Sequence, residues 1–515
     1  MSLALQVDGL TYRYPGQPDP LFKNLSFTLY QGDSIALLGA NGAGKTTLLK
    51  LLTGELEPAG GTVIRQTAPY LLRQEDLRGG QVLDALLAAY TDLGPLWAEA
   101  QRLESEGVPD PLRYADVLSA FAERGGYEVR QALESHLDEL NLSPELLTRH
   151  LTQLSGGERR LLKLVAAFAR PQPLYLLDEP TNYLDERGVR YLEPQINSAE
   201  AACLIVSHDR RFLDNTVTGV WELERGQFTR YSGNYSDFRY TKDVHYRESV
   251  RESGKLKRSV AQLKEQERSY KVWGARKEKE KSGATDKGFI GARAARLTKR
   301  GVQAKQRLRE EAQRLEQIKP WVEKRYEFLF ETPELPGGVC LNASFASGQP
   351  KSLRLEWGER VALTGANGAG KTTLLDRLVG MNEDTVLWHA GATIGYLPQR
   401  WDANLDAGSA ALRLERSLHD KARTLLGALN VKGERFSAPT EQLSEGQKRK
   451  IRLVELILRR PNVLVLDEPT THLDYRSIEQ LEAALQGFPG TLLLVTHDRQ
   501  LREQVTEREV RVGEP

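Results

Sequence analysis

The stretch GANGAGKTT at residues 39–47 occurs again, letter for letter, at residues 365–373. Glycines followed by Lys and Thr, between a short apolar run and a helix, form a loop whose backbone N–H groups surround phosphate oxygens. Each half of the chain is therefore predicted to hold a phosphate-binding loop. The expected phosphate-contacting residues are Gly39, Asn41, Gly42, Ala43, Gly44, Lys45, Thr46 and Thr47, and in the second copy Gly365, Asn367, Gly368, Ala369, Gly370, Lys371, Thr372 and Thr373.

Three further motifs repeat at a constant offset. LSGGE at 154–158 recurs as LSEGQ at 443–447, LDEPT at 177–181 recurs at 466–470, and SHD at 207–209 recurs as THD at 496–498. All three pairs lie 289 residues apart, which predicts two copies of one domain. The two loop lysines lie 326 apart, so the first copy holds about 37 additional residues after Gln74. Helical spacing of apolar residues predicts a helical hairpin there, over 84–125.

The repeated acid pairs predict the chemistry of the loops. Apolar runs that end in Asp178 and Asp467 are typical of buried parallel strands, and ligands gather at the carboxyl ends of such strands. The motifs predict Mg²⁺ ligands, polarisers of the attacking water and γ-phosphate contacts. An acid pair at a strand end could instead cap a helix, and a lone His is often structural. The Mg²⁺ ligands would be Thr46, Gln74, Asp178, Thr372, Gln399 and Asp467, the water polarisers Glu179 and Glu468, and the γ-phosphate contacts His208 and His497.

The charge of the chain is unevenly distributed. The 515 residues carry a net charge of +1, yet residues 241–320 hold 23 Lys and Arg against 11 Asp and Glu. This segment reads as two long helices that fold back at a turn over 282–288, as an antiparallel coiled coil. Its net charge of +12 favours a polyanionic partner, although a charge run can also be only a solvated helix face. The expected domains are residues 1–240, 241–323 and 324–515.

The composition excludes two broad classes of protein. Two cysteines cannot build a disulfide framework, and no stretch reaches the roughly 18 apolar residues of a membrane helix. The first residues also lack the basic and apolar regions of a signal peptide. A cytoplasmic protein without a membrane contact is expected.

The pairing of LSGGE with a phosphate loop resembles ATP-binding cassette ATPases. The resemblance implies two α/β cassettes that pair within one monomer and enclose two ATP molecules head to tail. In that family the LSGGE signature of one cassette completes the ATP site of the other. Ser155, Gly157 and Glu158 would then cap ATP held by Lys371. Ser444, Gly446 and Gln447 would cap ATP held by Lys45.

Two fused cassettes joined by a charged helical linker are similar to the ABC-F family. That resemblance implies a ribosome-binding ATPase that acts at the tRNA exit site and contacts rRNA and the P-site tRNA. The stretch KGFIGARAAR at 287–296 is similar to linker tips in the antibiotic-resistance branch of the family. The resemblance and the local basic charge assign RNA contacts to Lys287, Phe289, Ile290, Arg293, Arg296, Lys299 and Arg300.

Some residues depart from the family pattern. Glu445 replaces the first glycine of the second signature, and Glu158 replaces the usual Gln in the first. Tyr14 is the expected adenine-stacking aromatic, with Tyr12 as an alternative, and only Phe345 is a candidate in the second copy. Each of these aromatics could instead be a core residue of a strand. Two other functions stay open: a DNA-remodelling ATPase that uses the same basic helices, and the ATP-binding subunit of an importer, for which a short neutral linker is expected.

Overall fold

The structure is a computed structural model that divides into two compact units, Met1–Ser236 with Tyr326–Pro515, and Asp237–Arg325. We call residues 2–236 the first repeat and residues 330–513 the second repeat. The structure describes residues 2–72, 80–182, 184–224, 226–281, 287–318, 330, 334–345, 350–366, 368–380, 386–399, 416–429, 431 and 433–513.

The first repeat contains two sheets. The larger is six-stranded in the order β5-β6-β7-β3-β8-β9, parallel except for β9, and the smaller is antiparallel in the order β2-β1-β4. Every residue of β6 and β7 is buried, as expected for central parallel strands covered on both faces. The strands are β1 (Leu3–Tyr12), β2 (Phe22–Tyr30), β3 (Ser34–Leu38), β4 (Gly60–Arg65), β5 (Tyr70–Leu72), β6 (Leu174–Asp178), β7 (Ala202–Val206), β8 (Gly219–Glu224) and β9 (Gln227–Ser232).

The helices of the first repeat begin where the motifs predict. Helix α1 opens at Lys45 after Gly44, whose φ of 101° lies in the left-handed region that favours glycine. Helix α6 opens one residue after Ser155, whose hydroxyl accepts from the Glu158 N–H as an N-cap. The helices are α1 (Lys45–Thr53), α2 (Val82–Leu87), α3 (Gly94–Ser105), α4 (Pro111–Glu123), α5 (Gly126–Glu139), α6 (Gly156–Phe168), α7 (Glu186–Ser198) and α8 (Arg210–Thr216).

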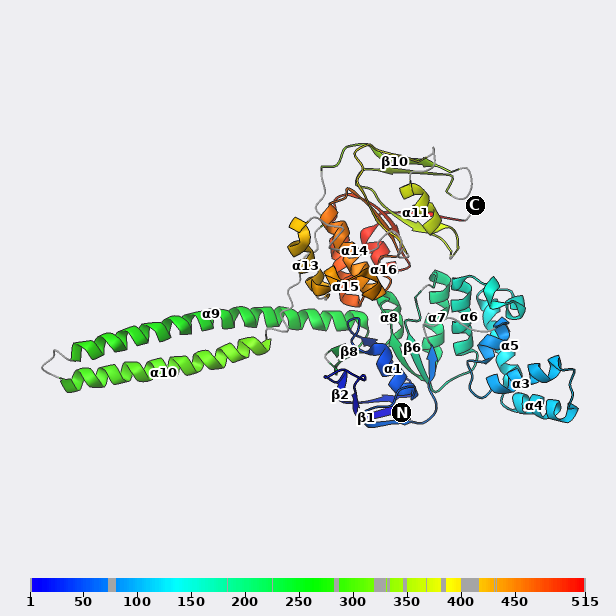
Figure 1. Ribbon diagram of the computed structural model, residues 1–515, viewed down its shortest axis with the longest axis horizontal. Coiled ribbons are helices and arrows are strands. Elements are labelled where there is room, and N and C mark those ends of the chain that lie inside the picture. Colours follow the sequence, from blue (N-terminus) through cyan, green and yellow to red (C-terminus); the bar gives the residue numbers. More distant parts are fainter. Residues whose placement is uncertain are drawn as a thin grey trace. The chain divides into compact units, whose positions relative to one another are not determined.

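Helices α3 and α4 occupy the segment predicted as a helical hairpin. They are separated at residues 106–110, and Asp110 caps α4 by accepting from the Arg113 N–H. Ala100, Leu103 and Val117 form a small core between the two helices, which lie side by side in Figure 1. The hairpin therefore has a hydrophobic cluster of its own.

The second repeat has the same two-sheet plan. Its larger sheet is parallel in the order β14-β15-β16-β12-β17, and its smaller sheet is antiparallel in the order β11-β10-β13. The strands are β10 (Val339–Ser344), β11 (Ser352–Glu356), β12 (Arg360–Thr364), β13 (Val386–Trp388), β14 (Ile394–Leu397), β15 (Val463–Asp467), β16 (Thr491–Val495) and β17 (Arg508–Arg511). The helices are α11 (Lys371–Gly380), α13 (His419–Ala428), α14 (Glu445–Arg459), α15 (Tyr475–Gln486) and α16 (Arg499–Val505).

The basic segment forms two long antiparallel helices, α9 (Tyr235–Lys281) and α10 (Lys287–Ile318) (Figure 1). Glu252 in the first half of α9 pairs with Arg314 near the end of α10 at 2.8 Å. Helix α9 has 47 residues, or about 70 Å at 1.5 Å per residue. It begins at Tyr235, before the expected start of the linker at residue 241. The expected turn over 282–288 is also too long, because α10 begins at Lys287.

None of the helices within the described residues is sufficiently long and apolar to cross a membrane.

Candidate nucleotide-binding sites

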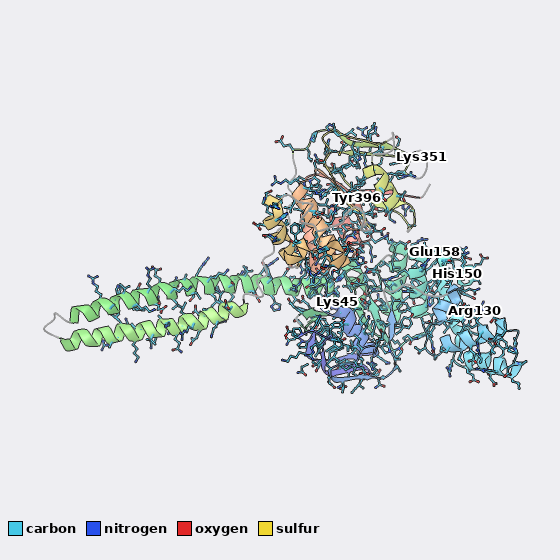
Figure 2. All side chains as sticks on the ribbon, viewed as in Figure 1. Lys45, Arg130, His150, Glu158, Lys351 and Tyr396 are labelled. Carbon is cyan, nitrogen blue, oxygen red and sulfur yellow. The ribbon has the colours of Figure 1, made fainter. Side chains whose placement is uncertain are left out.

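The two phosphate loops place their lysines in the same way. Lys45 Nζ donates to the carbonyl of Gly39 at 2.8 Å, and Lys371 Nζ donates to that of Gly365 at 2.8 Å. Burial lowers the pKa of both lysines, and the nearby carboxylate of Glu179 or Glu468 opposes this effect. Each ammonium is thus held at the carbonyl that opens its loop. Lys45 is labelled in Figure 2.

The loop threonines contact the first acid of each pair. Thr46 Oγ1 donates to Asp178 Oδ2 at 3.0 Å, and Thr372 Oγ1 donates to Asp467 Oδ2 at 2.7 Å. Burial raises the pKa of both carboxyl groups, that of Asp467 to about 6. The other oxygen of Asp467 is buried and has no hydrogen-bond partner among the described residues.

A hydroxyl beside a partly unsatisfied carboxylate fits Mg²⁺, which prefers oxygen ligands. Within the described part of the chain, no cluster of three or more His, Cys, Asp and Glu side chains could hold a metal ion. Mg²⁺ bound by one or two protein oxygens usually completes its coordination with water and phosphate oxygens. Gln399 lines the same cavity as Glu468, whereas Gln74 lies outside the described residues.

The second acid of each pair contacts the repeated histidine. His208 Nε2 lies 3.2 Å from Glu179 Oε1, and His497 Nε2 lies 3.5 Å from Glu468 Oε1. Burial raises the pKa of Glu179 well above its ordinary value and lowers that of His208, so both groups tend toward neutrality. A carboxylate with a raised pKa is suited to accept a proton near neutral pH.

The backbone at both glutamates is strained in the same way. Glu179 has φ 50° and Glu468 has φ 47°, in the left-handed region that costs most residues energy. Arg160 stabilises this conformation by donating to the Glu179 carbonyl at 3.0 Å, and Arg449 donates to the Asp467 carbonyl at 2.8 Å. These arginines were not predicted as site residues, although their 289-residue offset was a signal that could have found them.

One cavity of about 410 Å³ lies over the first phosphate loop. It is lined by residues of the first repeat that include Tyr14, Lys45, Thr46, Asp178, Glu179 and His208. The Tyr14 hydroxyl bonds to Thr47 Oγ1 at 2.7 Å, and its ring meets that of Tyr12 edge to face. In the second repeat Phe345 is buried in a core, so the expectation that it stacks on adenine is wrong.

A larger cavity of about 1030 Å³ combines residues from both repeats. From the first repeat it takes Ser155 and Gly157 of the signature; from the second it takes Gly368, Gln399, Glu468 and His497. The structure therefore brings the first signature to the second phosphate loop. Ser155 is fixed by Glu158, whose carboxylate accepts from both the Ser155 N–H and the Ser155 hydroxyl at 2.8 Å (Glu158 is labelled in Figure 2). Asn367 of this loop lies outside the described residues.

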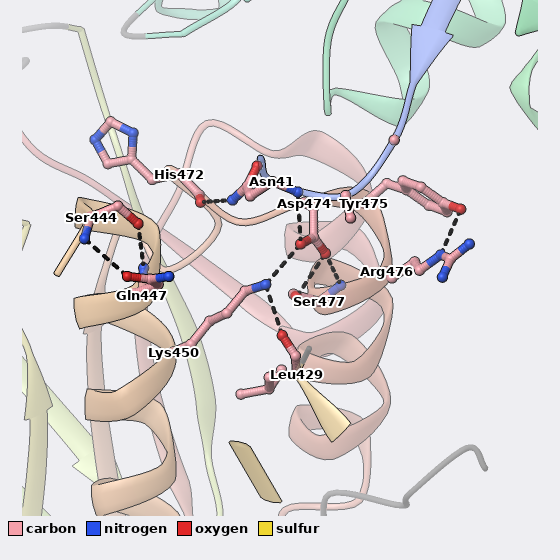
Figure 3. A network of polar contacts seen from close by, with 12 residues as sticks. Asn41, Leu429, Ser444, Gln447, Lys450, His472, Asp474, Tyr475, Arg476 and Ser477 are labelled. Atoms are coloured by element: carbon pink, nitrogen blue, oxygen red, sulfur yellow. Dashed lines mark hydrogen bonds and ion pairs between the residues drawn. The ribbon is translucent and has the colours of Figure 1, made fainter. Parts of the chain in front are cut away.

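The second signature lies against the first phosphate loop. A Cβ at Gly446 would stand 3.0 Å from Asn41 Nδ2 and 2.6 Å from the His472 carbonyl, so only glycine fits without a shift. Asn41 Nδ2 itself donates to the His472 carbonyl at 2.7 Å (Figure 3). Ser444 caps α14 and is bound in return by Gln447. His472 reaches Asn41 from a φ of 63°, a conformation that His, Asn and Asp adopt more readily than most residues.

Behind this contact is an ion pair that the first repeat cannot form. Lys450 Nζ donates to Asp474 Oδ2 at 2.7 Å and to the Leu429 carbonyl at 2.9 Å, and both charged side chains are buried (Figure 3). Burial alone would raise the pKa of Asp474, but Lys450 lowers it. The position equivalent to Lys450 in the first repeat is Leu161.

The residues predicted to bind RNA lie at the start of α10. Arg296, Lys299 and Arg300 are exposed on this helix. The side chains of Lys287, Phe289, Ile290 and Arg293 lie outside the described ones.

Comparison with known proteins identifies relatives over nearly the whole chain. The family model described as ABC transporter matches residues 22–182 and 349–471. The ribosome protection protein VmlR of Bacillus subtilis is 30% identical over 96% of this chain and 84% of its own length. The tylosin resistance ATP-binding protein TlrC of Streptomyces fradiae is 32% identical over 98% of this chain and 96% of its own length.

Solved structures show the same fold. The archaeal ribosome recycling factor aABCE1, in complex with the stalk protein aP1, superposes with a TM-score of 0.56. The match covers 98% of this chain and 88% of that one, at 19% identity. The resemblance inferred from the motifs is confirmed: the chain belongs to the ATP-binding cassette family that the ABC transporter model describes, and it is an ABC-F type protein with two cassettes.

Proposed function

We propose that this chain is an ATP-hydrolysing, ribosome-binding translation factor that acts at the tRNA exit site and confers antibiotic resistance by ribosome protection. The observation that carries the proposal is the larger cavity, in which Ser155 and Gly157 face Gly368 and Glu468 of the other repeat. Such a cavity suits a nucleotide whose binding closes the two cassettes. Similarity to the ribosome protection protein VmlR supports the ribosomal role, and similarity to the tylosin resistance protein TlrC supports the role in resistance.

Each ATP would be held by one phosphate loop and the opposite signature. The backbone N–H groups of the loops and the lysines Lys45 and Lys371 bind the phosphates, and the signature glycines allow a close approach. Tyr14 would cover the adenine of the first site. Thr46, Asp178 and Gln74 would hold one Mg²⁺, and Thr372, Asp467 and Gln399 the other. Bound Mg²⁺ neutralises charge on the phosphate oxygens.

Hydrolysis would depend on the second acids and the histidines. Glu179 and Glu468 orient the attacking water and accept its proton, while His208 and His497 contact the γ-phosphate. The strained backbone at Glu179 and Glu468 would aim these carboxylates, since Arg160 holds the Glu179 carbonyl and Arg449 holds the Asp467 carbonyl. Water therefore meets a base in a fixed position, and release of phosphate would reopen the cassettes.

The linker, residues 241–323 between cassettes at 1–240 and 324–515, would be the RNA-binding part. Residues 271–310 hold 13 basic and 4 acidic side chains, so binding to RNA phosphates should weaken steeply with salt. The pairing of α9 with α10 as a coiled coil would present Arg296, Lys299 and Arg300 to rRNA or to the P-site tRNA. Phe289 and Ile290 would insert among bases, where stacking of the Phe289 ring is worth about 1–3 kcal/mol per base.

The first test is sedimentation of cell lysate that contains the Glu179→Gln, Glu468→Gln double variant and ATP. We expect the variant to co-migrate with 70S ribosomes, because it closes on ATP and cannot reopen by hydrolysis. Added substitutions of Arg293, Arg296, Lys299 and Arg300 by Gln should abolish co-migration.

Control substitutions to Gln at Arg130, Lys351 and Lys421, exposed basic residues outside the linker, should leave co-migration unchanged. Figure 2 labels two of these controls. Absence of the double variant from ribosomes would contradict the proposal. A nucleic-acid complex that survives RNase but not DNase would favour the DNA-remodelling alternative.

A further inference from the structure

Among the ion pairs that connect the repeats, two are made by equivalent residues that do not line the nucleotide cavities. Arg210 at the start of α8 pairs with Glu482 of α15, and Arg499 at the start of α16 pairs with Glu193 of α7, at 2.5 Å in the second case. Arg499 lies 289 residues after Arg210, and Glu482 lies 289 residues after Glu193. The two pairs are therefore one contact made twice by equivalent residues, as a two-fold interface requires.

Both pairs are shielded from water. The side chains of Arg210 and Glu482 are 3% and 15% exposed, and those of Arg499 and Glu193 are 10% and 16% exposed. A buried pair is costly to break, because the remaining partner is left as an uncompensated charge. Arg210 also lies 3.8 Å from Asp498 Oδ2 of the other repeat, which adds a second contact across the interface.

The arginine of each ion pair lies two residues after the repeated histidine of its own repeat. Asp209 follows His208 and caps α8 by accepting from the Phe212 N–H at 3.0 Å. Asp498 follows His497 and caps α16 by accepting from the Leu501 N–H at 2.9 Å. The contact between Arg210 and Asp498 thus joins the two histidine loops directly. A displacement of either loop would change this contact with the other.

We propose that Arg210–Glu482 and Arg499–Glu193 form a reciprocal clasp that positions His208 and His497 together, so that ATP turnover at one site depends on the other. This inference rests on the proposed ATP hydrolysis. The four charged residues are positioning residues, since they act through the histidine loops. Two ATP sites that worked independently would not require these four charged residues.

The test measures steady-state ATP hydrolysis by the purified full chain without ribosomes. Wild type should show a Hill coefficient above 1 for ATP. Arg210→Gln and Glu482→Gln should each lower it to 1 and reduce kcat on the order of 10-fold, the loss expected from a slightly misplaced catalytic group. The double variant should lose little more than either single variant, because both remove the same contact.

Two controls separate positioning from stability. Arg210 contacts Glu482 through a single nitrogen, and Arg210→Lys keeps the positive charge. This variant should therefore fold and retain cooperativity. Arg211→Gln breaks the neighbouring pair with Glu503, whose side chains are 46% and 57% exposed, and it should change neither kcat nor the Hill coefficient.

The outcomes distinguish the two proposals. A wild-type chain that does not hydrolyse ATP would overturn the proposed function. Wild-type hydrolysis with a Hill coefficient of 1, or Arg210→Gln with wild-type cooperativity, would overturn the clasp alone. Losses of kcat that add up in the Arg210→Gln, Glu482→Gln double variant would also overturn the clasp. If Arg210→Gln does not fold, loss of cooperativity in a folded Arg210→Lys variant would likewise count against the clasp.

Discussion

Lys450 and Asp474 belong to the second repeat, yet their ion pair lies beside the first phosphate loop. Asp474 Oδ2 accepts from Lys450 at 2.7 Å and lies 3.5 Å from the backbone nitrogen of Asn41. The equivalent of Lys450 in the first repeat is Leu161. The two nucleotide sites therefore differ in a charged contact directly behind one loop.

Lys450→Leu should destabilise the protein strongly, although it copies the residue of the first repeat. It leaves the carboxylate of Asp474 buried without its cation, which costs about 3–5 kcal/mol. Denaturant unfolding measures the loss, and adding Asp474→Asn should recover part of it. Lys448→Leu, which breaks the partly exposed pair with Glu445 in the same helix, should cost less than about 1 kcal/mol. Equal effects of the two lysine substitutions would contradict the role of the buried pair.

Asp209 should make stability depend on pH. Burial, and then the facing carboxylate of Asp498, raise its pKa to about 6, while Arg499 opposes and Glu193 adds to the shift. The unfolded chain has the ordinary value of 3.8, so it loses this proton first as pH rises. The contribution of Asp209 to the free energy of unfolding therefore falls between pH 3.8 and about 6 and is constant above that pH.

Asp209→Asn keeps the helix cap and removes this titration. Its gain in thermal midpoint over wild type should grow from pH 4 to pH 6 and then stay level. Asp110→Asn changes an exposed cap of the same kind and should show no such growth. A gain that is the same at every pH would show that Asp209 does not titrate in this range.

The motif residues could be predicted because each belongs to a short sequence pattern that occurs in both repeats. The later motifs also keep a constant separation of 289 residues. Lys450 could not be predicted, because its partner Asp474 follows 24 residues later and nothing local shows that the two side chains meet. The same limit explains Phe345: an aromatic at a strand end packs into the core or faces the ligand depending on the strand's orientation. Contacts between the repeats, such as Arg210 with Glu482, depend on the assembled interface.

At the scale of elements, the pair α3 and α4 is held mainly by its own small core. Leu103 is 3% exposed between the helices, whereas Leu112 on α4 is 80% exposed. Leu103→Ala should lower the local stability of this hairpin by about 2–5 kcal/mol through lost contacts and a cavity. Amide hydrogen exchange in α3 and α4 measures this change.

The control for the hairpin is Leu112→Ala, which should leave exchange in α3 and α4 unchanged because its side chain is in water. Exchange in β6 and β7 should be unaffected by either variant, since those strands belong to another core. Faster exchange throughout the first repeat after Leu103→Ala would show that the hairpin and the sheet unfold as one unit.

Both long helices were predicted from the spacing of their apolar residues, yet their ends were not. Helix α9 begins five residues before the expected boundary at 240, because Ser236 donates to Asp214 through its N–H and its hydroxyl, both at 2.7 Å. Because Asp214 lies 22 residues before Ser236, the spacing of apolar residues within α9 could not predict where the helix begins. Helix α10 begins at Lys287, within a stretch whose glycines indicated a turn.

At the scale of the molecule, the sequence predicted two α/β domains and a basic helical segment because repeats and charge runs are global features. The family resemblance implied that the cassettes pair, and both repeats fall in one compact unit, Met1–Ser236 with Tyr326–Pro515, distinct from residues 237–325. Ion pairs such as Arg210–Glu482 contribute to the contact between the repeats. The composite cavity could be expected only from the family resemblance, since no spacing in one copy indicates the other.

The reciprocal pairs Arg210–Glu482 and Arg499–Glu193 also constrain how this protein can change over generations. A charge altered at one position has its partner in the other half of the gene, so the two duplicated halves must diverge together. Half-genes exchanged with a relative should give a working protein only when all four charges match. The two repeats can therefore no longer accumulate substitutions independently of each other.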